Sequence, residues 1–150
     1  MTATENKSLQ RDIRRALFRR IMVYAGVILA IVLVFTIAFR QFKIYSNARL
    51  ALREAKNIKM SLEMVNMEYY ALDISIYDDT ADGNLRKGAY DYVRKTQGDF
   101  KGEIRLVGYD STNRRITGLE YETEDYIVRY SHIGEEDKWQ VCQIKELLTY

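Results

Sequence analysis

One uncharged apolar run, residues 21–39 (IMVYAGVILAIVLVFTIAF), sets the main constraint on how this 150-residue chain can fold. Only Gly26 and Thr36 within the run fall outside the hydrophobic set. As an α-helix its 19 residues would be about 28 Å long, close to the ~30 Å hydrocarbon core of a bilayer. The mean hydropathy of −0.32 averages this run with a polar remainder. We therefore predict a single-pass membrane helix over residues 21–39, which argues against a plain cytosolic enzyme.

Basic residues close the run at both ends. Arg19 and Arg20 precede Ile21, and Arg40 follows Phe39, so these five residues are the predicted membrane anchor. A cleaved signal peptide is the alternative, because it also places basic residues before an apolar stretch. The run is long for the apolar part of a signal peptide, however, and no small-x-small cleavage motif precedes Arg40. We therefore expect the helix to be retained.

The distribution of basic residues predicts the orientation of this helix. Residues 1–20 carry six lysines and arginines, and so do residues 40–59. Five of the first six lie within ten residues of the apolar run, against three of the second six. This density favours residues 1–20 as a basic cytoplasmic tail and places the C-terminal domain outside the cell membrane. We expect the tail to orient the helix and attract anionic headgroups, and we expect no nucleic-acid binding.

The pattern after the apolar run predicts that the helix continues outside the membrane over residues 40–77. The chain contains no proline, and no glycine occurs between residues 36 and 82. Apolar residues recur in this segment at alternating spacings of four and three, typical of a heptad stripe. The stripe consists of Ile44, Ala48, Ala51, Ala55, Ile58, Leu62, Val65 and Tyr69.

We expect the two halves of this stripe to have different neighbours. The first four residues, Ile44, Ala48, Ala51 and Ala55, are predicted to contact a partner helix, either in another protein or in a second copy. Residues 58–76 are predicted to pack on the chain's own domain. A second stripe is expected to widen that buried face: Met60, Met64, Met67, Ala71 and Ile74.

Residues 78–150 are predicted to form the β-rich remainder of the outer domain. From residue 103 on, apolar and polar residues alternate in four short segments, separated by turn-forming residues near 110–113, 124–125 and 134–137. This spacing indicates an antiparallel meander, and its apolar face needs a cover that only the long helix is large enough to supply. The predicted fold is α+β: a long N-terminal helix, its first half spanning the membrane, packed on a small four-stranded antiparallel sheet.

The sequence offers little material for a catalytic or cofactor site. His132 and Cys142 are the only histidine and cysteine, so a nucleophile–base pair or a histidine-rich metal centre is not expected. We predict a non-enzymatic protein with no cofactor and no small-molecule substrate.

One acidic segment copies the first half of a calcium-binding loop. Asp78, Thr80 and Asp82 occupy its first three ligand positions, and Gly83 follows where such loops turn sharply. Ala89 stands where the bidentate acid of a calcium loop belongs. We interpret the segment as a solvated turn that ends the helix, with calcium binding as the alternative.

The stretch NARLALREAKNIKMSLEMVNMEYYALDISIYDD and the strands after it resemble the type IV pilin and pseudopilin family. In that family a long N-terminal helix, half of it in the membrane, packs on a small antiparallel sheet. Prepilins carry a Gly-Phe processing site with a nearby glutamate, whereas this junction reads FRRIMVYAGVILA and holds no acid. The resemblance therefore implies either an unprocessed, pilin-like relative or a structural look-alike.

Two classes of function follow from these observations. The first is a membrane-anchored structural or assembly subunit of a pilus, secretion or envelope complex, with protein partners along the long helix and self-assembly as one form. The alternative is a membrane-tethered module that binds or senses an extracytoplasmic ligand, which would require a pocket.

Overall fold

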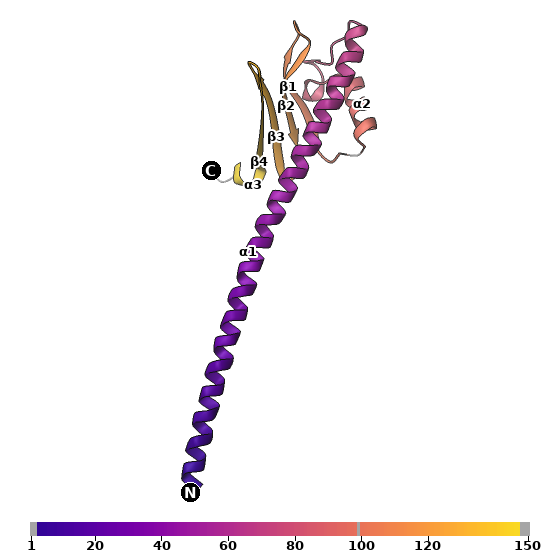
Figure 1. Cartoon of the computed structure of the whole chain (residues 1–150). Helices are drawn as coiled ribbons and strands as arrows, with labels where there is room; N and C mark the ends of the chain where they lie inside the picture. Colours follow the sequence, from indigo (N-terminus) through magenta and orange to yellow (C-terminus); the bar gives the residue numbers. More distant parts are fainter. Residues whose placement is uncertain (1–2, 99, 148–150) are drawn as a thin grey trace. The chain divides into compact units, whose positions relative to one another are not determined.

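A computed structural model describes the backbone of residues 3–98 and 100–147, and the side chains of residues 14–15, 17–98 and 100–145. The chain divides into two compact units, residues 1–45 and residues 46–150. Helix α1 (Ala3–Ala71) provides all the described structure of the first unit and the first element of the second (Figure 1).

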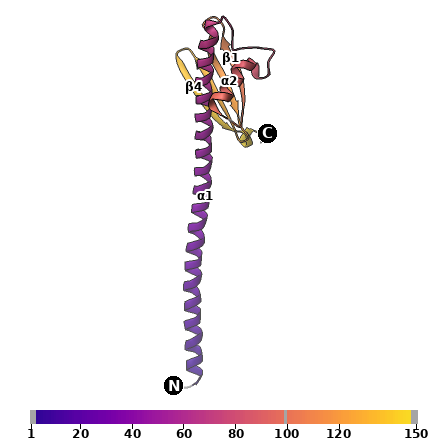
Figure 2. The ribbon, with the colours of Figure 1, turned by 90° about the vertical axis from the view of Figure 1, so that its right-hand side faces the viewer.

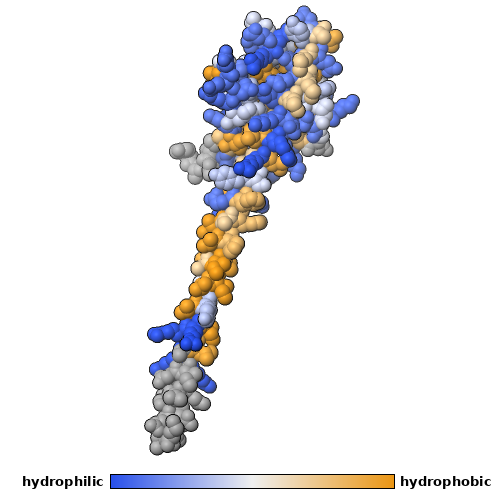
Figure 3. Space-filling model, viewed as in Figure 1, coloured by the Kyte–Doolittle hydropathy of each residue, from blue (hydrophilic) through white to orange (hydrophobic). Residues whose placement is uncertain are grey.

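The described side chains of the first unit are exposed almost throughout. Every one from Leu17 to Lys43 is exposed, including the whole apolar run. Figure 3 shows this run as a band of apolar surface on α1. By length and composition α1 can cross a membrane once, and none of its most apolar window is buried. Apolar residues exposed on every side of a helix match a lipid environment.

The second unit confirms the predicted α+β fold. Four strands form one sheet in the order β1-β2-β3-β4, and each neighbouring pair is antiparallel. Two short helices precede the sheet and one follows it. The elements are η1 (Asp82–Asn84), α2 (Lys87–Gln97), β1 (Glu103–Asp110), β2 (Arg115–Glu122), β3 (Tyr126–Ile133), β4 (Glu136–Gln143) and α3 (Ile144–Leu147).

Strand register explains how the sheet separates an apolar face from a charged one. Tyr121 on β2 lies between Ile104 on β1 and Val128 on β3, and all three are buried. The alternate positions carry charged pairs such as Glu120 with Arg129. Because side chains alternate across a strand, the apolar residues collect on one face. The last part of α1 lies across one face of the sheet, beside α2 (Figures 1 and 2).

The heptad stripe of α1 forms the helical half of the core. Ile58, Leu62 and Val65 are at most 1% exposed, which confirms their predicted intramolecular packing. Ala51 and Ala55 are 5% and 0% exposed and belong to the same core, so the expectation that they contact a partner helix is wrong. Alanine lets the helix backbone approach a sheet whose inner face carries bulky tyrosines, and this close packing buries the alanine side chains.

The remaining two residues of the predicted partner face differ from these alanines. Ala48 is partly buried and packs against the core of the second unit. Ile44 lies in the first unit. The boundary between the domain core and the rest of the stripe therefore lies at residue 48, not after residue 55.

Helix α1 ends at Ala71 and not at residue 77 as predicted. The amide of Leu72 donates to the carbonyl of Tyr69, and Asp73 follows with a φ of 58°, a left-handed conformation that no helix interior adopts. Asp73 pairs with Arg114, which precedes β2. This ion pair joins the turn after α1 to the start of β2.

Candidate protein-interaction face on helix α1

Three methionines form an exposed apolar row on the outer side of α1. Met60, Met64 and Met67 are 56%, 41% and 67% exposed. At 100° per residue they lie on the side of the helix opposite Leu62 and Val65. The prediction that they widen the buried face is therefore wrong. We call these three residues the Met face, and Figure 3 shows a strip of apolar surface along this part of α1.

Polar and charged residues border the Met face. Arg53, one heptad before Met60, is exposed on the same side of the helix, and Glu68 is exposed beside Met67. Glu63 accepts a hydrogen bond from the Lys59 ammonium, Nζ to Oε1 at 2.7 Å. A contiguous apolar row with a charged border is typical of a protein-binding surface. Methionine side chains suit such a surface because they are flexible and polarisable.

A polar cluster attaches α1 to the β3–β4 hairpin on the other side of the helix. The Tyr130 hydroxyl donates to Oδ1 of Asp137 at 2.7 Å, and Nδ1 of His132 lies 2.7 Å from the same oxygen. Lys59 lies 4.4 Å from the centre of the Tyr130 ring. Burial disfavours the charged form of Lys59, but its hydrogen bond and ion pair with Glu63 outweigh this effect and raise its pKa. These contacts make a structural link between helix and hairpin.

Asp137 predicts a dependence of stability on pH. A hydrogen bond from Tyr130, and to a smaller extent one from His132, holds the pKa of Asp137 below its ordinary value of 3.8. Because the pKa is lower in the folded state, the stabilisation is complete above the ordinary value and is lost as the pH falls through the lowered one. The difference in unfolding free energy between wild type and Asp137→Asn should therefore shrink below about pH 4. Urea unfolding of the full chain in detergent, followed by the fluorescence of Trp139, measures it.

Asp91→Asn on the exposed surface of α2 is the matched control for this pH series. Its unfolding free energy should follow that of the wild type across the same pH range. A difference between wild type and Asp137→Asn that stays constant down to about pH 2 would contradict the assigned role of this carboxylate.

The segment considered for calcium forms a local turn. Oδ1 of Asp78 accepts hydrogen bonds from the Thr80 amide at 3.2 Å and the Thr80 hydroxyl at 2.6 Å. These bonds lower the pKa of Asp78. Asp82 begins η1, and Gly83, with a φ of 67°, lets the backbone pass close to the Ile104 carbonyl on β1. Within the described residues, no three His, Cys, Asp or Glu side chains group as metal ligands would.

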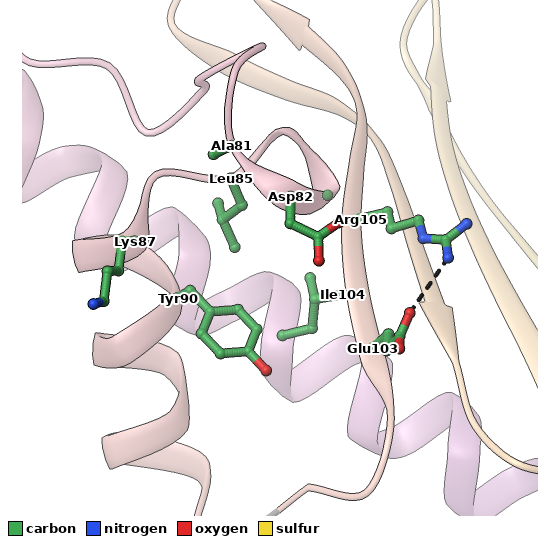
Figure 4. A pocket seen from close by; sticks show the side chains of 9 residues that line it. Ala81, Asp82, Leu85, Lys87, Tyr90, Glu103, Ile104 and Arg105 are labelled. Atoms are coloured by element: carbon green, nitrogen blue, oxygen red, sulfur yellow. Dashed lines mark hydrogen bonds and ion pairs between the residues drawn. The ribbon is translucent and has the colours of Figure 1, made fainter.

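This turn also forms one wall of a cavity of about 450 Å³ (Figure 4). Leu85, Tyr90 and Ile104 give the cavity an apolar lining, and Asp82 lies beside them. Lys87 on α2 also lines the cavity, on the side away from Asp82 (Figure 4). Arg105 is directed to Glu103, with Nη2 3.3 Å from Oε2. The cavity can accommodate an apolar group next to a carboxylate. The sequence did not predict it, because its residues come from η1 and its flanks, from α2 and from β1.

The single histidine and the single cysteine do not come together. Strand pairing places His132 opposite Asp137 at one end of the β3–β4 hairpin and Cys142 opposite Ile127 near the other. They therefore form no nucleophile–base pair with each other.

No protein-family model, no curated protein and no solved structure matches this chain. The architecture is nevertheless pilin-like, because a long apolar N-terminal helix packs on a four-stranded antiparallel sheet.

Proposed function

We propose that this chain is a single-pass membrane protein that acts as a non-enzymatic assembly subunit. Its pilin-like domain lies on the extracytoplasmic side and belongs to a pilus, secretion or envelope complex. The observation that carries this proposal is the Met face, because it is exposed on the same helix that contains the membrane-crossing segment. A helix with one face on its own sheet and an apolar opposite face suits a subunit packed between neighbours.

Energetics support a partner on this face. Full burial of one exposed methionine side chain is worth about 1.5–3 kcal/mol. Since the three are already partly covered, they would contribute about 2.5–5 kcal/mol before the costs of association. The membrane reduces those costs because it holds the helices of two anchored proteins in one layer with a common direction. Protein partners along α1 are therefore favoured over nucleic acid, which would need a basic surface on the domain.

Replacement of Met64 by glutamate in the full-length chain tests this proposal. A charge at the centre of the Met face should reduce the amount of cross-linked complex in native membranes to a small fraction. The reason is that an unpaired carboxylate would be buried in the contact. Chemical cross-linking and mass spectrometry of the membrane fraction measure the complex. Met64→Leu preserves apolar volume and should retain the complex. An unchanged amount of complex in Met64→Glu would contradict a role for the Met face.

The cavity beside η1 favours a second candidate function, a membrane-tethered module that binds an extracytoplasmic ligand. Its apolar lining and the Asp82 carboxylate suit a small ligand that carries an apolar group and a positive charge. A screen of such amines against the full chain in detergent tests this candidate by thermal shift. Stabilisation that disappears in Asp82→Asn would support it, and no stabilisation by any amine would count against it.

A further inference from the structure

We propose that the Met face binds a parallel helix from a different protein and does not bind a second copy of this chain. This inference rests on the proposed function, since it needs both helices to be anchored in one membrane. It follows from the charged residues that border the Met face and from the symmetry of a pair of identical helices.

The spacing of the methionines defines the contact line of such a pair. Met60, Met64 and Met67 follow one another at four and three residues, the pattern that faces a partner in a two-stranded coiled coil. Asn57 and Arg53 lie three and seven residues before Met60 on the same line, and both are exposed. Glu63 and Glu68 flank the line on its two sides. A partner helix on the Met face must therefore meet one basic side chain and two acidic ones.

Two identical parallel helices would place like charges together. Twofold symmetry puts each residue at the same height in both copies, so Arg53 would face Arg53 of the second copy across the contact line. Glu63 would lie beside Glu68 of the second copy, five residues further along. Arg49 would meet Glu54 of the second copy, but Glu54 already accepts a hydrogen bond from Tyr121 at 3.0 Å. Lys59 pairs with Glu63 and weakens that second contact, so the Arg53–Arg53 contact is the main repulsion. Asn57 would face Asn57 of the second copy, a seam position that costs stability, so the symmetric pair is disfavoured.

A staggered pair of copies does not solve this problem within a bilayer. A shift of fifteen residues, about 22 Å along the helix, is needed to bring Arg53 to Glu68 of another copy. The apolar run of the shifted copy would then be displaced by most of the ~30 Å hydrocarbon core. This displacement would expose apolar side chains to water, so a stagger large enough to pair Arg53 with Glu68 is disfavoured.

The fitting partner follows by charge complementarity. It has an acidic side chain opposite Arg53, apolar side chains opposite the three methionines, and a basic side chain near Glu68. Because Lys59 already pairs with Glu63, Glu68 is the stronger site for that basic group. The charges thus select a non-identical helix, and the methionines supply its apolar contact area.

Cysteine cross-linking of the full chain in lipid vesicles tests this inference without a need to identify the natural partner. Cys142→Ser removes the native thiol, and Met64→Cys supplies a reporter on the Met face. The probe is a second, differently tagged version of the chain that also carries Arg53→Glu and Glu68→Lys. This probe presents the opposite charges at both positions and leaves the Lys59–Glu63 pair intact.

Mixed vesicles should give more cross-links between the native-charge chain and the probe than between two native-charge chains. With equal amounts of the two chains, random pairing would yield twice as many mixed dimers as native-charge homodimers. We expect the measured ratio of mixed to native-charge dimers to exceed this value about fivefold. Lys95→Cys on exposed α2 is the matched control position and should show no excess. Trp139 fluorescence in urea verifies that each variant is folded.

Three outcomes would overturn the inference. Mixed and native-charge dimers in the random ratio would show that a second copy occupies the Met face as readily as its charge-reversed counterpart. Cross-links between Asn57→Cys of one chain and Ala71→Cys of another, both with Arg53 and Glu68 intact, would show staggered copies. Folded, inserted chains that form no cross-link in any mixture would show that the face does not dock such a helix. A failure of the proposed function would give different results. Either the chain would not insert into the membrane, or native membranes would contain no complex that depends on Met64.

Discussion

Ala55→Glu is expected to lower the free energy of unfolding of the 46–150 unit by about 3–5 kcal/mol. Ala55 is 0% exposed and lies in the core between α1 and the sheet. A glutamate there would bury an uncompensated carboxylate where the packing leaves room for a methyl group. Urea unfolding of the full chain in detergent measures this loss, with the single Trp139 as the fluorescent reporter.

Met64→Glu is the matched control, since it makes the same charge change on the opposite side of the same helix. Met64 is 41% exposed, and its replacement should alter the unfolding free energy by no more than about 0.5 kcal/mol. Equal destabilisation by both substitutions would contradict the assignment of one stripe to the core and the other to the surface.

Leu29→Arg combined with Leu33→Arg is expected to abolish membrane insertion. The run of residues 21–39 contains twelve Leu, Ile, Val and Phe residues. At about −0.3 to −0.6 kcal/mol each, they favour insertion by about 4–7 kcal/mol. Two central arginines cost about 5–7 kcal/mol and cancel this gain. The full chain should move out of the carbonate-resistant membrane fraction.

Leu29→Ile with Leu33→Ile is the control for this experiment and should leave the chain in the membrane fraction. It keeps the apolar character of the run and changes only side-chain shape. Retention of the double arginine variant in that fraction would contradict a membrane-spanning role for residues 21–39.

The fold was predictable because its signals are periodic. Alternation of apolar and polar residues specified four strands, and the absence of proline allowed a long helix. The end of that helix was not predictable: Asp73 adopts a left-handed conformation and pairs with Arg114, forty-one residues away in sequence. Local sequence carries no signal for such a contact.

The functional features, like the fold, were only partly predictable from the sequence. The membrane-crossing segment is visible in the sequence because an uncharged run of 19 residues depends on no other part of the chain. The cavity beside η1 was not visible, because η1, α2 and β1 each contribute a part of it. Chemistry that requires several segments to meet depends on their three-dimensional packing.

By itself, the sequence determined that α1 carries two apolar stripes and that a four-stranded sheet needs a helical cover. Only the tertiary structure decided that Ala51 and Ala55 belong to that cover and that the Met face does not. The stripe with Ala51, Ala55 and Leu62 packs on the sheet because small and branched residues let the helix lie close to its tyrosines. The Met face points outward as a result. The core stripe also contains Ile58, Leu62 and Val65, whose branched aliphatic side chains gain more from burial than those of the Met face.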